Sequence, residues 1–294
     1  MGILEEQAII VTGAGRGLGE AFAIHAAQAG ARVVVNDIDE EMAEKVAATI
    51  AEFGGIAVPS GHSVADPQDA ERIVQCCVRE FGTVNGLVNN AAVNYEALPW
   101  LDEAGRMREL IETNVLGSMY TGTAAIRAMR EHGGAVVNIC SGAFFGQRKL
   151  AGYAASKGAI ASLTYSWALD CEESGIRVNA VCPLAHTRMV WQSERALRNC
   201  PPSNTPARIA PVVLHLLSSA AEGITGQVIR CNGTELHVVG GPFVKQPVLR
   251  RDCWDSAGVA KAFDEVFSAH LEPYGLEKRQ PPRLRRLIAP LESA

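Results

Sequence analysis

Short apolar segments alternate along the chain with longer segments of helical periodicity. Short apolar segments are typical of buried strands, whereas helices repeat apolar residues every three or four positions. The strand-like segments are those at 8–11, 32–36, 56–60, 86–88, 135–140, 177–181 and 228–231. This alternation predicts an α/β fold with one doubly wound parallel sheet of about seven strands and helices on both faces.

Capping residues predict where several helices begin and end. Asp66 precedes Pro67, which suits an N-cap followed by the first helical position. The dipeptide Thr205-Pro206 opens another periodic segment in the same way, and Gly54 follows the end of a third.

The composition shifts after Gly240-Gly241-Pro242, so we expect a domain at 1–240 and a C-terminal extension at 241–294. One amphipathic helix is predicted in the extension, at about 255–271. The extension is expected to pack on its own domain or on a neighbouring subunit. Its short basic segment, KRQPPRLRR, is weak evidence for nucleic-acid binding in an acidic protein.

A glycine-rich turn, TGAGRGLG at 12–19, follows the first predicted strand directly and leads into a helix. Glycine permits a positive φ and a close approach of the backbone to a ligand. The N-terminus of the helix presents free amides, which favour an anion. Gly13, Gly17 and Gly19 therefore predict a phosphate-binding turn, although Leu18 departs from the G-x-G-x-x-G spacing.

Asp37 ends the second predicted strand, about 20 residues after the glycines. A carboxylate there accepts hydrogen bonds from an adenosine ribose and repels a 2′-phosphate, which favours NAD over NADP. Arg16 is a counter-signal because its cation suits a 2′-phosphate. Asp37 or Asp39 can instead merely cap the next helix.

Ser141, Tyr153 and Lys157 are the candidate catalytic residues. Ser141 follows a predicted strand, and Tyr153 and Lys157 lie four positions apart on the next predicted helix. A nearby ammonium lowers a phenol's pKa, and such a phenol exchanges protons with a carbonyl or alcohol oxygen. The alternative is an ordinary surface pair on a helix.

Asparagines follow the same strand ends. Asn89-Asn90-Ala91-Ala92 ends the fourth predicted strand, where small residues leave room for a flat ligand. Asn89 suits a structural role at least as well as a ligand role. Asn114 lies within an apolar helix and needs a partner, by default in the core.

Composition excludes several classes of function. The chain has 294 residues, a net charge of −5 and a pI of about 5.8, which argues against nucleic acid. We expect no membrane span and no signal peptide. The eight cysteines form no Cys-x-x-Cys, which suggests reduced thiols and a cytoplasmic protein. The seven histidines lack ligand spacing, so no metal site is expected.

Together these motifs resemble the short-chain dehydrogenases/reductases, in the compact TGxxxGxG and YxxxK form, over residues 5–240. Asn179 and Pro183 extend the resemblance. It implies a Rossmann-like fold, NAD as cofactor, a homotetramer or dimer, and hydride transfer between NAD(H) and a secondary alcohol or ketone.

The resemblance also implies residue roles. Tyr153 would be the general acid/base, Lys157 would lower its pKa and hold the nicotinamide ribose, and Ser141 would orient the reacting oxygen. Asn114 would hold a water in a proton relay. The implied cofactor-binding residues are Gly13, Arg16, Gly17, Leu18, Gly19, Asp37, Val64, Asn90, Ala91, Tyr153, Lys157, Pro183 and Thr187.

Three features depart from that family's pattern. Ser63 stands where an Asp often contacts adenine, and Leu184 replaces the usual Gly after Pro183. The extension beyond Gly240 is longer than the family's minimal form, and such tails cover the substrate pocket or cross to a neighbouring subunit.

The substrate class is open. The segment GITGQVIRCNGTEL is similar to domains that act on 3-hydroxyacyl-CoA, and a steroid or other bulky cyclic alcohol competes. Phe144, Phe145 and Trp191 would line a hydrophobic pocket, or else serve core or interface packing. The alternative functions are a non-catalytic NAD-binding regulator and an epimerase or dehydratase that retains its NAD.

Overall fold

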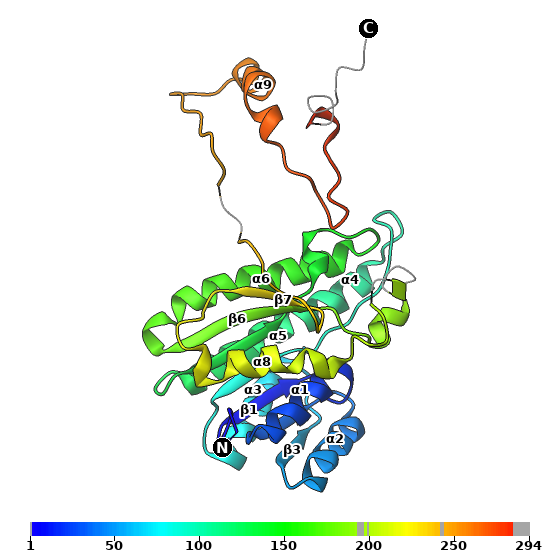
Figure 1. Cartoon of the computed structure of the whole chain (residues 1–294), viewed down its shortest axis with the longest axis vertical. Helices are drawn as coiled ribbons and strands as arrows, with labels where there is room; N and C mark the ends of the chain where they lie inside the picture. The colour runs from blue at the N-terminus through cyan, green and yellow to red at the C-terminus, as the bar shows by residue number, and fades with distance from the viewer. Residues whose placement is uncertain (1, 193–196, 199, 242–243, 285–294) are drawn as a thin grey trace.

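One eight-stranded sheet forms the centre of the molecule (Figure 1). The structure is a computed structural model, which describes residues 2–284 except 193–196, 199 and 242–243. The strand order is β3-β2-β1-β4-β5-β6-β7-β8, and every neighbouring pair is parallel except β7 with β8. The strands are β1 (Ala8–Thr12), β2 (Arg32–Asn36), β3 (Ile56–Ser60), β4 (Gly86–Asn89), β5 (Gly134–Ile139), β6 (Ile176–Pro183), β7 (Val228–Cys231) and β8 (Leu236–Val238).

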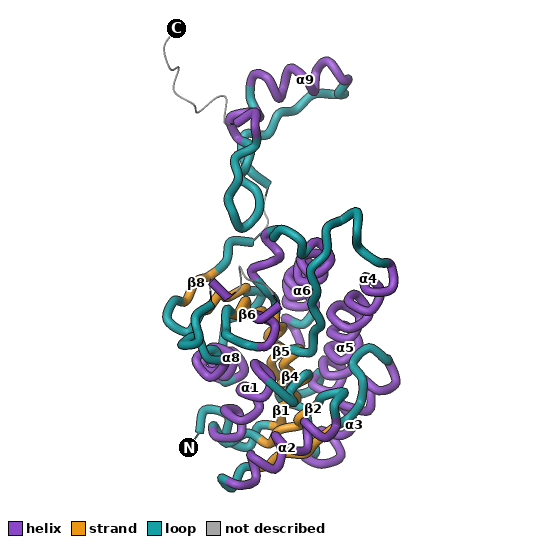
Figure 2. The backbone as a smooth tube through the Cα atoms, turned by 90° about the vertical axis from the view of Figure 1, so that its right-hand side faces the viewer, coloured by secondary structure: helices purple, strands orange, loops and turns teal. Residues whose placement is uncertain are grey.

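Helices cover both faces of this sheet and bury its apolar side chains. Helices α1, α2 and α8 pack on one face, and α3, α5 and α6 pack on the other. Figure 2 shows the two helical layers from the side. The helices are α1 (Gly17–Gln28), α2 (Glu40–Glu52), α3 (Pro67–Phe81), α4 (Ala104–Ile111), α5 (Gly117–Met129), α6 (Ala151–Asp170), α8 (Ala210–Leu217) and α9 (Ser256–Glu265). The predicted doubly wound α/β fold is confirmed.

Two predicted elements differ in detail. The sheet has an eighth, antiparallel strand, Leu236–Val238, whose three residues are all exposed and give no buried apolar run. The helix predicted at 255–271 ends at Glu265 and is followed by a short 3-10 helix, Phe267–His270. The Ser268 hydroxyl donates to the Phe263 carbonyl at this break, so a side chain there takes the place of a helical amide.

The C-terminal extension stands away from the sheet in both views (Figures 1 and 2). It contacts its own domain again through a turn in which Tyr274 and Arg279 form a bridge. The Leu276 amide donates to the Gly146 carbonyl at 2.8 Å, and Glu277 pairs with Arg148 at 3.3 Å. The end of the basic segment and Pro242 lie outside the described residues.

Candidate active site

A cavity of about 850 Å³ opens at the carboxyl ends of the parallel strands, where ligands of doubly wound sheets bind. It gathers most of the predicted site residues, although they come from distant parts of the chain. The predicted residues that line it are Gly13, Arg16, Gly17, Leu18, Asp37, Val64, Asn90, Ala91, Ser141, Tyr153, Lys157, Pro183 and Thr187.

The glycine turn connects β1 to α1 along one wall of the cavity. Gly13 and Gly17 line it with φ values of +61° and +62°, a conformation that other residues adopt only with strain. Gly19 does not line the cavity. A Cβ on Gly19 would lie 2.1 Å from the Gly13 carbonyl oxygen, so this glycine allows α1 to pack against the turn.

Asn90 fixes the turn from the next strand. Its side-chain amide donates to the carbonyls of Thr12 at 2.8 Å and Gly13 at 2.9 Å, and the Thr12 hydroxyl accepts from the amide of Asn90. The neighbouring Asn89 is buried in the core, where it bonds Asn138 at 3.0 Å. Asn90 therefore belongs to the cavity and Asn89 to the core.

Asp37 lies at the end of β2 and is only 8% exposed. Its two oxygens accept from the amides of Gly15 at 2.9 Å and Asp39 at 3.1 Å. Arg16 forms an ion pair with Asp39 at 2.9 Å, which partly neutralises its cation. The adjacent Ile38 is 75% exposed and also lines the cavity; we made no prediction for it.

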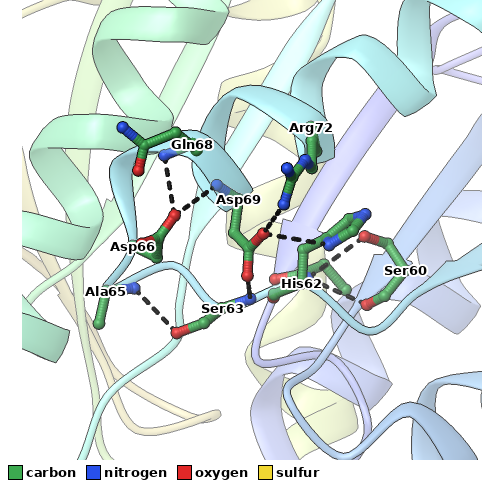
Figure 3. A network of polar contacts seen from close by, with 9 residues as sticks. Ser60, His62, Ser63, Ala65, Asp66, Gln68, Asp69 and Arg72 are labelled. Carbon is green, nitrogen blue, oxygen red and sulfur yellow. Dashed lines mark hydrogen bonds and ion pairs between the residues drawn. The ribbon is translucent and has the colours of Figure 1, made fainter.

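Figure 3 shows the polar network that holds the loop after β3, where Ser63 lines the cavity. Asp69 accepts from the Ser63 amide at 3.2 Å and from Arg72 at 2.6 Å. Asp66 caps α3 by accepting from two amides at 2.9 Å, as predicted. The Ser63 hydroxyl accepts from the Ala65 amide at 3.2 Å, so its hydrogen bond stabilises the loop itself.

Ser141, Tyr153 and Lys157 converge on the opposite wall. Ser141 follows β5 and caps a short 3-10 helix, Gly142–Phe145. Tyr153 lies in the first turn of α6, and the Lys157 ammonium is 5.7 Å from the centroid of its ring. Lys157 is 3% exposed and donates to the Ile139 carbonyl at 2.7 Å.

Burial shifts the pKa values of Tyr153 and Lys157 in opposite directions. It raises the pKa of Tyr153 to about 12, and the neighbouring Ser141 hydroxyl opposes that rise. Burial lowers the pKa of Lys157 to about 8. The loss of hydration is the largest cause of the raised Tyr153 pKa, and Lys157 is not among its causes in the protein alone. That Lys157 lowers the pKa of Tyr153 stays a prediction.

Asn114 is fully buried and does not line the cavity. It lies in a π-helical turn, Glu112–Leu116, between α4 and α5. Its side chain bonds both the amide and the carbonyl of Val93, at 2.8 and 2.9 Å, and donates to Ser156 at 3.1 Å. This is the core hydrogen bonding that the residue pattern favours; the water relay stays a prediction.

The wall near Tyr153 differs from the apolar wall that we expected. Phe144 and Phe145 contact each other, with ring centroids 4.1 Å apart, and neither lines the cavity. The side chain of Trp191 lies outside the described residues. Leu150, Met189 and Val190 supply apolar side chains to the lining. Asn94, Glu96 and Gln147 also line the cavity, and sequence reasoning missed these polar residues because they lie in loops without periodicity or motif.

The described parts of the chain carry no sign of a metal centre or of a membrane span. No three His, Cys, Asp or Glu side chains lie together there as metal ligands would. No helix in those same parts is long and apolar enough to cross a bilayer.

The sequence profile of the short chain dehydrogenases matches residues 7–197. This chain belongs to that family. A 2-(S)-hydroxypropyl-CoM dehydrogenase of Xanthobacter autotrophicus is 34% identical over 246 residues, 78% of this chain and 96% of that protein. A cyclohexanol dehydrogenase of an Acinetobacter species is 36% identical over 228 residues, 74% of this chain and 90% of that one.

The fold of this short-chain dehydrogenase also matches a solved structure. It is the crystal structure of a short chain dehydrogenase from Mycobacterium avium, with a TM-score of 0.82 and 29% identity. The match covers 96% of this chain and 98% of that chain, so it extends beyond residue 240.

Proposed function

We propose that this short-chain dehydrogenase transfers a hydride between NAD(H) and a secondary alcohol or ketone. The proposal rests on one observation: a single cavity is lined both by the candidate catalytic residues and by the candidate cofactor-binding residues. Ser141, Tyr153 and Lys157 line one part of it, and the glycine turn with the buried carboxylate of Asp37 lines another.

The residues present fit a dinucleotide. Gly13 and Gly17 present backbone without side chains to the cavity. The turn also packs closely on its neighbour, since a Cβ on Gly13 would lie 2.7 Å from the Ala91 Cα. The N-terminus of α1 suits the pyrophosphate. The Asp37 carboxylate and the pairing of Arg16 with Asp39 favour an unphosphorylated ribose, which is the reason for preferring NAD to NADP.

When bound, NAD(H) supplies or accepts the hydride. The chain handles the proton: Tyr153 donates it to the carbonyl oxygen during reduction, and Ser141 hydrogen-bonds the same oxygen. A pKa of about 12 keeps Tyr153 protonated at neutral pH, which is the state that reduction of a carbonyl requires. Lys157 brings a positive charge 5.7 Å from the ring, which stabilises a developing phenolate.

The named relatives act on unlike alcohols, 2-(S)-hydroxypropyl-CoM and cyclohexanol. They support the reaction class without selecting a substrate. For the hydrophobic substrates that we considered, a 3-hydroxyacyl-CoA or a steroid-like alcohol, the lining offers Leu150, Met189 and Val190 rather than Phe144 and Phe145.

The proposal includes a cytoplasmic homo-oligomer, either a tetramer or a dimer. Free thiols support the compartment: the cysteines of the structure are unpaired, and all but Cys253 are buried. Light scattering tests the assembly, and a purely monomeric protein would contradict it.

The alternatives predict different behaviour. A non-catalytic regulator would bind NADH without turnover, although such a protein has no need of Tyr153 and Lys157. An epimerase or dehydratase that retains its NAD would copurify with cofactor that does not exchange.

The deciding experiment follows NADH absorbance with purified protein and a panel of ketones. Tyr153→Phe should keep the wild-type Kd for NADH and lose at least about 100-fold in kcat, since general acid catalysis contributes that much. NADPH serves as the matched cofactor control. Turnover retained by Tyr153→Phe would refute the catalytic assignment.

A further inference from the structure

The cavity wall next to the catalytic tyrosine is residues 94–96, and this segment is held at both ends. At one end, Asn114 hydrogen-bonds the amide and carbonyl of Val93. At the other, Ala97 and Leu150 form a parallel bridge. A segment of three residues between two such anchors has little freedom to move.

The second anchor places the segment beside the reacting group. Leu150 is the residue immediately before α6, whose first turn carries Tyr153. Ala97 pairs with Leu150, so Glu96 is one residue away from the segment that leads into α6. Glu96 and Tyr153 both line the cavity.

Alternate side chains of the segment point to opposite sides. Tyr95 faces α6: its hydroxyl is 3.6 Å from the place where Gly152 would carry a Cβ. The guanidinium of Arg106 lies 4.0 Å from the centroid of the Tyr95 ring. Asn94 and Glu96, on either side of Tyr95, line the cavity. Tyr95 therefore fixes the direction in which its two polar neighbours point.

The side chains of Asn94 and Glu96 have no polar partner among the described residues. Neither the Glu96 carboxylate nor the Asn94 carboxamide has a hydrogen bond or ion pair with another described residue. Both are partly buried, and the Asn94 Oδ1 atom is shielded without a partner. A carboxylate only accepts hydrogen bonds, so a ligand that displaces water from the partly buried Glu96 must supply a donor.

The negative charge of Glu96 limits which substrate groups can lie beside it. A phosphate or carboxylate on the substrate would be repelled by Glu96, and an apolar group would bury the carboxylate without a partner. Glu109 and Arg188 also line the cavity, but both are exposed and are screened by solvent. Hydroxyl groups satisfy Glu96 without either cost, and Gln147 adds a second donor and acceptor to the lining.

We propose that the substrate is an uncharged polyhydroxylated alcohol, a sugar or cyclic polyol, and that Glu96 accepts the hydroxyl next to the one oxidised. The inference rests on the proposed function. In oxidation the carbinol C–H hydride passes to NAD⁺ and the hydroxyl proton leaves through Tyr153. The products are a ketone, NADH and one proton, and the hydroxyl held by Glu96 is unchanged.

The experiment compares kcat/KM for cis- and trans-1,2-cyclohexanediol, myo-inositol and an aldohexose with that for cyclohexanol, in the full-length enzyme with NAD⁺. The wild type should prefer the best polyol by about 10- to 100-fold, the effect of one hydrogen bond to a charged group. Glu96→Leu should abolish this preference, while Glu96→Gln should keep part of it.

The matched control is Glu103→Gln, which removes a nearby exposed carboxylate that does not line the cavity. It should leave both the preference and the Kd for NADH unchanged. Glu96→Leu should also keep the wild-type Kd for NADH, because only the substrate end is altered.

Four results would overturn the proposal, and the first three are comparisons among active substrates. Cyclohexanol could match the polyols, Glu96→Leu could lower both activities equally, or protonated 2-aminocyclohexanol could be the better substrate, which would indicate a cationic ligand. If no polyol is turned over although NADH binds, the polyol assignment is overturned and the dehydrogenase proposal still stands. Loss of NADH binding in the wild type would refute the proposed function itself.

Discussion

Asp37 has a structural role, and we propose a recognition role for the same side chain. Its oxygens accept two backbone amides, so the carboxylate is held in the cavity wall. Asp37→Asn keeps an acceptor oxygen but removes the charge that repels a 2′-phosphate. We expect the ratio of NADPH to NADH turnover to rise at least about 10-fold, in line with the removal of a close like charge.

Asp39→Asn is the control for that variant. It releases Arg16 from its ion pair but keeps an acceptor for the helix cap of α2. The rise in the NADPH ratio should be smaller than for Asp37→Asn. Equal ratios in all three proteins would contradict the role of Asp37 at the ribose.

Lys157 predicts a pH dependence of stability. Its pKa falls from 10.5 to about 8 on folding, so between these values the unfolded chain binds more protons and stability rises with pH. Over this window the wild type should gain about 3 kcal/mol in unfolding free energy relative to Lys157→Met. Urea unfolding of both proteins at pH 7, 8, 9 and 10 measures this difference. If the unfolding free energies of the two proteins change equally with pH, the lowered pKa of Lys157 is refuted.

At the scale of elements, the π-helical turn between α4 and α5 positions a wall of the cavity. The turn places Asn114 in the core, where its side chain binds Val93. Asn114→Ala leaves the Val93 amide and carbonyl unsatisfied and should lower the free energy of unfolding by about 2–3 kcal/mol. Ser156→Ala, which removes one of the three bonds of Asn114, should cost about 1 kcal/mol.

Denaturant unfolding of both variants is the measurement. An Asn114→Ala protein as stable as the wild type but without turnover would favour the proton relay over the structural role. The stability and the rate therefore separate the two interpretations of this residue.

At the scale of the whole molecule, the extension and the domain meet beside the substrate end of the cavity. Leu276 and Glu277 contact Gly146 and Arg148, next to Gln147 in the lining. A chain that ends at Gly240 should fold and keep its Kd for NADH, while its KM for substrate rises. Circular dichroism and NADH titration test this, and a truncated chain that does not fold would contradict the boundary at 240.

Local patterns were sufficient for the order of the elements and for much of the site. Buried strands followed by glycine, aspartate or serine leave these residues at the carboxyl ends of a parallel sheet, where one cavity must gather them. Short-range periodicity predicts both where strands end and which residues share a helix face. The sequence alone therefore placed Gly13, Asp37, Ser141 and Tyr153 at this cavity.

Long-range packing decided the rest. Asn94 and Glu96 carry no periodic signal, and the hydrogen bonds of Asn114 and the pairing of Ala97 with Leu150 bring them to the cavity. Burial also raises the pKa of Tyr153, and this burial follows from atoms that come from distant parts of the chain. Contacts between distant segments and the loss of hydration arise only when the chain is folded, so neither is readable from spacing along the chain.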